Sequence, residues 1–150
     1  MNPPADPAVK TLKVEDEPPL RHATAAALFA AVDRMRPVGP SFIIVSRDDG
    51  NYAQAGGGDG VFTVEWREYG EPFVHLVAGK GTPSQDPIAI QMSGGKTDVL
   101  LHEVLNADDV KRLLGAFLLH GRQPEGYLWR NITQGFTRKA GPPAGEISEL

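Results

Sequence analysis

The side chains best suited to metal binding or acid–base chemistry in this 150-residue chain are its four histidines, His22, His75, His102 and His120. No two of them stand in His-x-His or His-x-x-x-His spacing, and a tetrahedral metal site needs several converging ligands. His102 and Glu103 are neighbours on a predicted strand, where neighbours point to opposite faces. We interpret His75 as a core histidine and His120 as a cation at a helix C-terminus. The sequence therefore predicts neither a metal nor a cofactor.

Glu65 is the carboxyl group that comes closest to a catalytic position. It shares one face of a predicted strand with Thr63 and Arg67, and a glutamate there serves as a general acid or base when its pKa is raised. We expect Arg67 to lower the pKa of Glu65 instead, because a nearby positive charge favours the carboxylate. The pattern then predicts a surface ion pair.

Two short motifs resemble catalytic loops but lack an essential residue. Residues 94–97 read Gly-Gly-Lys-Thr, yet Ile90 stands where a phosphate-binding loop has its first glycine. Ser41 is followed by Phe42-Ile43, so the second glycine of a nucleophile elbow is missing. The chain also has no cysteine to supply a thiolate. No catalytic residue is predicted, and we expect the protein not to be an enzyme.

Negative charge is concentrated in one region of the chain. The formal net charge is −4, and residues 47–71 contain six acids and two bases, which accounts for all of it. This balance argues against nucleic-acid binding, which uses Lys and Arg to neutralise phosphates, whereas an acidic patch attracts a basic protein. The alternative is a solvated strand face with charged turns. The predicted partner-contact residues are Asp48, Asp49, Glu65, Glu68 and Glu71.

The length suits one domain with a single core. We expect residues 1–8 and 134–150 to be disordered tails around a domain at residues 9–133. The first residues lack the basic and apolar segments of a signal peptide. The longest apolar run, residues 25–32, is far shorter than the ~20 residues of a membrane span. The predicted location is therefore the cytoplasm, with no membrane partner.

The hydrophobic pattern predicts an α+β fold, a mainly antiparallel sheet (a meander) with two helices packed on one face. One helix is expected at residues 20–35, and the other between an Asn106 cap and a left-handed Gly121. Residues 79–87 are expected to form a mobile loop, and Trp129 to anchor the core. The expected strands are residues 10–14, 42–45, 52–55, 61–69, 73–77, 88–92, 98–105 and 127–132, with a glycine turn at 56–60.

Two segments carry a resemblance to a bacterial family. Residues 42–57, Phe-Ile-Ile-Val-Ser-Arg-Asp-Asp-Gly-Asn-Tyr-Ala-Gln-Ala-Gly-Gly, precede Phe-Thr-Val-Glu-Trp-Arg-Glu at 62–68. Residues 105–129 continue as an amphipathic helix, a Gly-Arg-Gln-Pro turn and a strand with Trp129. The first segment resembles a group of small bacterial proteins, and the closing segment resembles immunity proteins of polymorphic toxin systems, of the subtype that includes inhibitors of secreted deaminases. The resemblance implies non-enzymatic inhibition of one cognate toxin, and it supplies no contact residues. The chain departs from the family pattern at residues 79–96 and beyond 133.

Two functions are open at this point. The first is a cytoplasmic immunity protein that binds a cognate protein, a basic toxin domain, through the acidic strand face and its turns. The second is a small-molecule-binding or regulatory domain, in which the sheet face and the 79–87 loop form a pocket with His75 or Glu65. An exposed strand at the sheet edge would also allow a homodimer.

Overall fold

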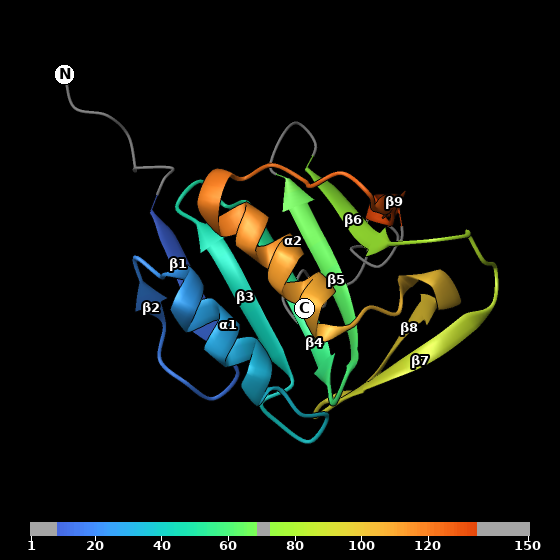
Figure 1. Ribbon diagram of the computed structural model, residues 1–150, viewed down its shortest axis with the longest axis horizontal. Helices are drawn as coiled ribbons and strands as arrows, with labels where there is room; N and C mark the ends of the chain where they lie inside the picture. Colours follow the sequence, from blue (N-terminus) through green and yellow to red (C-terminus); the bar gives the residue numbers. More distant parts are fainter. Residues whose placement is uncertain (1–8, 69–72, 135–150) are drawn as a thin grey trace.

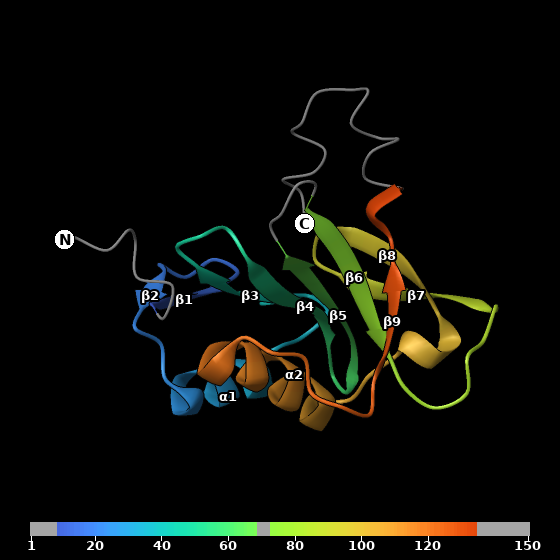
Figure 2. The ribbon, with the colours of Figure 1, turned by 90° about the horizontal axis from the view of Figure 1, so that it is seen from above.

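The protein, described at residues 9–68 and 73–134 in a computed structural model, has a seven-stranded antiparallel sheet and a separate two-stranded hairpin (Figure 1). The sheet has the order β2-β1-β3-β4-β5-β6-β9, and β7 and β8 form the hairpin. Both helices lie on one face of the sheet, so the predicted α+β class is confirmed (Figure 2). The strands are β1 (Lys10–Val14), β2 (Leu20–Arg21), β3 (Phe42–Arg47), β4 (Tyr52–Gly58), β5 (Val61–Glu68), β6 (Val74–Gly79), β7 (Pro87–Met92), β8 (Gly95–Leu100) and β9 (Leu128–Asn131).

Helix α2 (Ala107–His120) begins and ends as its sequence predicts. The Asn106 side chain accepts a hydrogen bond from the Asp109 N–H at 2.9 Å, and the Asp109 carboxylate accepts one from the Asn106 N–H at 3.1 Å. This reciprocal cap satisfies two amides that the helix itself leaves unpaired. Gly121 ends the helix in the left-handed region with φ of 69°, where a residue without Cβ is favoured.

Helix α1 (Ala25–Arg34) is shorter than the predicted helix at residues 20–35. The prediction was wrong because Leu20 and Arg21 form β2, paired with β1 at the edge of the sheet. The chain turns at His22, whose φ is 56°. Thr24 then begins the helix by accepting a hydrogen bond from the Ala27 N–H at 3.1 Å.

The hydrophobic core fills the space between the two helices and the sheet. Trp66 of β5 lies at its centre, edge-to-face with Phe117 at 5.2 Å and with Trp129 at 5.5 Å between ring centroids. Trp129 is therefore a core anchor, as its sequence context predicts. The fully buried apolar residues around this group include Leu28, Met35, Ile43, Val45, Val64, Leu105, Leu113 and Leu114.

The turn between β4 and β5 is tighter than expected. The predicted turn at residues 56–60 is wrong, because only Asp59 and Gly60 lie in it, with φ of 54° and 87°, and Gly58 pairs with Val61. The glycines before the turn are strand residues over which other segments pass closely. A Cβ on Gly58 would lie 2.5 Å from the Arg36 Cα, and a Cβ on Gly56 would collide with the Met92 side chain.

The tip of the β7–β8 hairpin forms hydrogen bonds with Glu15 and Ser41, which lie much earlier in the chain. Ser93 donates to Glu15 Oε2 at 2.5 Å, while Glu15 Oε1 accepts from the Ser41 N–H at 2.6 Å and the Ser41 hydroxyl at 2.9 Å. Burial acts to raise the pKa of Glu15, but these hydrogen bonds outweigh it and the pKa is lowered. The strand predicted at 98–105 ends at Leu100, because η1 (Leu101–Glu103) is a 3-10 turn.

Within the described ranges, none of the helices has the length and apolar character needed to cross a bilayer.

We predict that Gly58→Ala destabilises the protein by about 2–3 kcal/mol, because the new methyl group must displace the Arg36 backbone. Gly94→Ala is the matched control, since no atom of the described residues lies within 4 Å of a Cβ there, and its effect should stay within about 0.5 kcal/mol. Urea unfolding measures both. Equal stability of the two variants would contradict the close approach.

Candidate functional site

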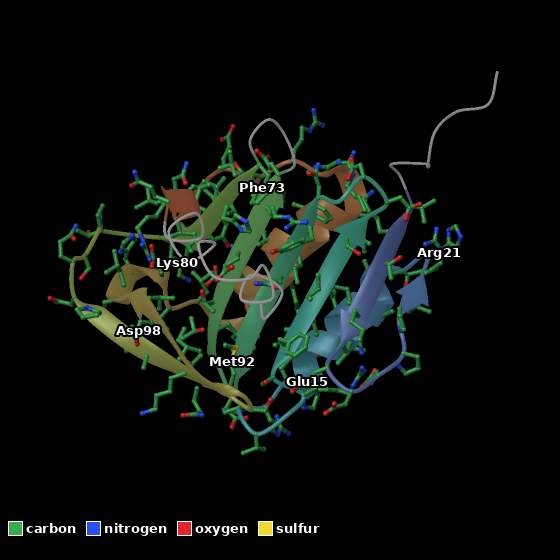
Figure 3. All side chains as sticks on the ribbon, turned by 180° about the vertical axis from the view of Figure 1, so that it is seen from behind. Glu15, Arg21, Phe73, Lys80, Met92 and Asp98 are labelled. Atoms are coloured by element: carbon green, nitrogen blue, oxygen red, sulfur yellow. The ribbon has the colours of Figure 1, made fainter. Side chains whose placement is uncertain are left out.

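The face of the sheet opposite the helices, here called the helix-free face, carries most of the polar side chains of the middle strands. The strand registers align two transverse rows of residues on it. Figure 3 views the sheet from this side. One row is Lys13, Ile44, Gln54, Glu65, Val77 and Arg130; the next is Thr11, Ser46, Tyr52, Arg67 and His75.

Glu65 lies in the middle of the first row, and its surroundings differ from the prediction. Burial raises its pKa, although a hydrogen bond from Gln54 at 3.2 Å and the charge of Arg130 act in the opposite direction. The expected ion pair with Arg67 does not form, and Glu65 has no ion pair with any described residue. The predicted lowering of its pKa is therefore wrong, because Arg67 points to other partners.

Arg67 lies against two aromatic rings. Its guanidinium carbon is 4.6 Å from the Tyr52 ring centroid and 5.2 Å from the Phe73 ring centroid. Its Nη2 also donates to the Gly50 carbonyl at 3.3 Å. Aromatic faces attract a cation, so these contacts hold the Arg67 charge at the β3–β4 turn and away from Glu65.

Two buried oxygen atoms beside Glu65 have no hydrogen-bond partner among the residues that the structure describes. Gln54 is 8% exposed and Thr63 is 4% exposed, and neither the Gln54 Oε1 nor the Thr63 Oγ1 is bonded. Gln54 is the cross-strand partner of Glu65, and Thr63 precedes Glu65 by two residues on the same face. The three side chains together form a group of hydrogen-bond acceptors.

The predicted acidic contact residues are distributed over two places. Asp48 and Asp49 lie in the β3–β4 turn, at the same end of the sheet as Glu68, whereas Glu65 lies on the helix-free face. Asp48 pairs with Arg21 at 3.3 Å and Asp49 with Arg47 at 3.0 Å, so nearby arginines neutralise much of this charge. Glu68 is exposed, and Glu71 lies outside the described residues.

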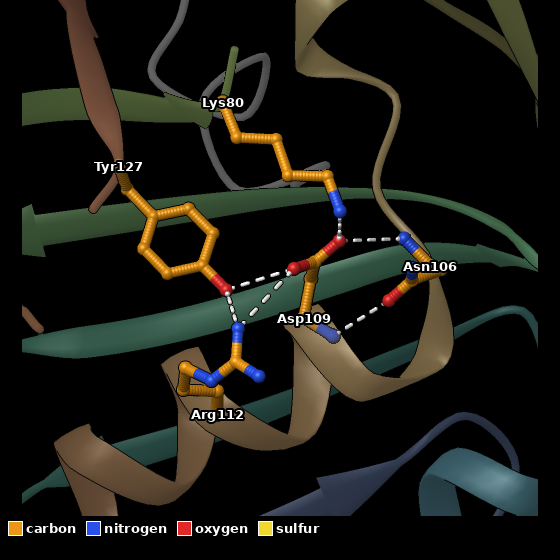
Figure 4. A network of polar contacts seen from close by, with 5 residues as sticks. All are labelled: Lys80, Asn106, Asp109, Arg112 and Tyr127. Carbon is orange, nitrogen blue, oxygen red and sulfur yellow. Dashed lines mark hydrogen bonds and ion pairs between the residues drawn. The ribbon is translucent and has the colours of Figure 1, made fainter. Parts of the chain in front are cut away.

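A second polar cluster joins the start of α2 to the sheet edge (Figure 4). Asp109, 2% exposed, accepts hydrogen bonds from the Tyr127 hydroxyl at 2.8 Å, from Lys80 and from the Asn106 N–H. Burial acts to raise the pKa of Asp109, but these donors outweigh it and the pKa is lowered. Arg112 in turn donates to Tyr127 at 2.8 Å. Both oxygens of Asp109 are occupied, so we assign this cluster a structural role.

The loop at 80–86 is held by the backbone and ring of His102. The Lys80 N–H donates to the His102 carbonyl at 2.9 Å, and the Ser84 N–H donates to His102 Nδ1 at 3.0 Å.

Glu103, fully buried, accepts two bonds from Arg130 at 2.7 and 2.9 Å. His102 and Glu103 lie in a 3-10 turn and not in the predicted strand. Residues 9–68 and 73–134 contain no group of three acidic or histidine side chains suited to a metal.

The sequence interpretation missed Gln54 and Arg130 as members of the helix-free face. The Asp59-Gly60 dipeptide is typical of two-residue hairpin turns, and a turn at these two residues places Gln54 opposite Glu65. The position of Gln54 could therefore have been predicted from the sequence. Arg130 reaches this face only because β9 returns beside β6, and no local pattern predicts that pairing.

No known protein family and no curated protein matches the chain.

We predict that His75 makes stability depend on pH. Burial, followed by the charge of Arg67, lowers the pKa of His75 to about 4 from 6.5. Below pH 6.5 His75 becomes protonated in the unfolded chain but stays neutral in the folded protein. The free energy of unfolding therefore falls as the pH drops towards 4, by up to about 3 kcal/mol. Urea unfolding from pH 7.5 to 4 should show this loss, and His75→Gln should reduce it. His120→Gln, at an exposed position, should retain it; a His75→Gln profile parallel to the wild type would contradict the assignment.

We predict that Asp109→Asn destabilises the protein by about 2 kcal/mol, because Lys80 and the capping amide lose their carboxylate. Asp108→Asn, an exposed acid in the same helical turn, is the control and should change stability far less. Because the pKa of Asp109 is lowered, its contribution is present above pH 3.8 and is lost as the pH falls through the folded-state pKa. Thermal unfolding at pH 7 and pH 3 measures both effects; equal loss at the two pH values would argue against a carboxylate-specific role.

Proposed function

We propose that the protein is a non-enzymatic interaction protein of the immunity type, which binds a cognate basic toxin through the helix-free face and blocks it. The observation that carries this proposal is the position of Glu65, a half-buried carboxyl group with no ion pair among the described residues, in the centre of that face. A surface of this kind favours a partner that brings positive charge. Sequestration of a toxin requires no catalytic group on the inhibitor.

The dimensions of the helix-free face support protein binding. One row of side chains crosses six strands, from Lys13 on β1 to Arg130 on β9. A stable complex buries about 800 Å² on each partner around a few anchor residues. Leu128, 40% exposed on β9, lies two residues before Arg130 on the same face and provides an apolar contact.

The small-molecule alternative places its pocket at the helix-free face and the 79–87 loop, and a cavity on the helix side of the sheet gives it little support. A cavity of about 150 Å³ lies between β1, β2 and α1, which is below the ~300–1,000 Å³ of most ligand sites. Its wall is mostly apolar, with an exposed Arg34–Glu17 pair at 3.2 Å. It therefore lacks the converging polar groups that orient a ligand. The lining residues are Leu12, Val14, Glu17, Pro18, Leu20, Ala27, Ala30 and Arg34.

We predict that the tagged protein captures a basic toxin domain encoded by a neighbouring gene, and that its co-expression protects cells from that toxin. Glu68→Lys should slow association several-fold, and more at low salt, because a rim charge acts mainly on encounter. Asp98→Lys, an exposed acid on the hairpin strand β8, is the control. Toxin toxicity that persists in the presence of the wild-type protein would refute the proposal.

A further inference from the structure

Three side chains with hydrogen-bond acceptors are neighbours on β4 and β5, on the helix-free face. Gln54 and Glu65 are direct cross-strand partners, and Thr63 lies next to Glu65 along the same face. Gln54 Nε2 donates to Glu65 Oε1 at 3.2 Å, so the amide is oriented by this bond. Its Oε1 and the Thr63 Oγ1 are buried without a hydrogen-bond partner in the described part of the chain. An unsatisfied buried polar atom costs about 1–3 kcal/mol, and a donor that reaches both atoms recovers part of this cost.

The charged groups around Glu65 are committed to other contacts. Arg130, across β6 from Glu65, makes a bidentate pair with the buried Glu103. Arg67 lies against Tyr52 and Phe73, and His75, with a pKa of about 4, is neutral at pH 7. On β1, the Lys13 ammonium donates to the Val14 and Glu17 carbonyls. The carboxylate of Glu65 therefore has a hydrogen-bonding amide beside it, and no cation of the described residues is bound to it.

A flexible side chain lies beside these acceptors. Gly56 pairs with Thr63 across β4 and β5, and the Met92 side chain of β7 rests directly on Gly56 (Figure 3). Methionine is unbranched and adapts its shape at binding surfaces. A rotation of Met92 would uncover the position of Gly56 beside Thr63, whereas Glu65 is already partly exposed.

We propose that Gln54, Thr63 and Glu65 form a pocket that receives one lysine or arginine side chain of the protein partner. This inference rests on the proposed function and specifies the chemistry of its central contact. The N–H groups of the incoming side chain donate to Glu65 and to the two unpartnered oxygens, and its positive charge supplies the ion pair that Glu65 lacks. Arginine is one of the residues enriched at the hot spots of protein interfaces.

The pocket is tested on the full chain by NMR titration with N-acetyl-argininamide and N-acetyl-lysinamide, with N-acetyl-glutaminamide as the neutral probe. The Gln54 side-chain amide and the Glu65 carboxyl carbon should shift saturably with a cationic probe and not with the neutral one. Glu65→Gln should weaken the probe at least tenfold and Thr63→Val about threefold, consistent with loss of one charged or one neutral contact. Asp98→Asn, which removes an exposed acid on the hairpin strand β8, should bind like the wild type.

Several outcomes overturn the pocket. They are an unchanged titration in Glu65→Gln, an equal response to the neutral probe, and a structure with only an ordered water between Gln54 and Thr63. Affinity for the captured toxin separates this inference from the proposed function. Protection by the wild type with unaltered affinity in Glu65→Gln rejects the pocket alone. Probe binding without any protective partner rejects the proposed function and the assignment of the pocket to it.

Discussion

The register between β4 and β5 determines where nearly every residue of the candidate site lies. A two-residue turn with positive φ at Asp59 and Gly60 matches the twist of the strands and pairs Gly58 with Val61. Because side chains alternate along a strand, a slip of one residue would turn Trp66 out of the core and Glu65 into it. The same register puts the β4 glycines beneath the hairpin and beneath the Arg36 backbone. The buried core and the polar face are thus two results of one pairing.

Elements whose boundaries are set by local chemistry were predictable from the sequence. The second helix carries its own cap at Asn106 and its own stop at Gly121, and the alternation of β5 separates core from polar residues without knowledge of its neighbours. The first helix was predicted too long, since Leu20 and Arg21 take their conformation from pairing with β1. That pairing lies outside the reach of helical periodicity.

The candidate site was predictable only in part, because it also depends on residues from distant parts of the chain. Glu65 was recognised from its strand face, but its electrostatics depend on Gln54, eleven residues away, and on Arg130, which arrives from the last strand. The charge of Asp48 depends on Arg21, 27 residues away. A count of acidic residues gives the sign of the net charge of a chain segment. The net charge of a surface depends on which basic residues the fold brings to it.

The hydrogen bond between the hairpin tip and Glu15 has a consequence for the order of folding. Ser93 and Glu15 are separated by 78 residues, so their bond closes a loop that contains β2, α1 and four further strands of the sheet. Closing so long a loop in an unfolded chain carries a large entropy cost, which falls once the intervening strands have formed. We therefore expect β7–β8 to dock late in folding, after a stage in which the helix-free face is not yet bordered by the hairpin.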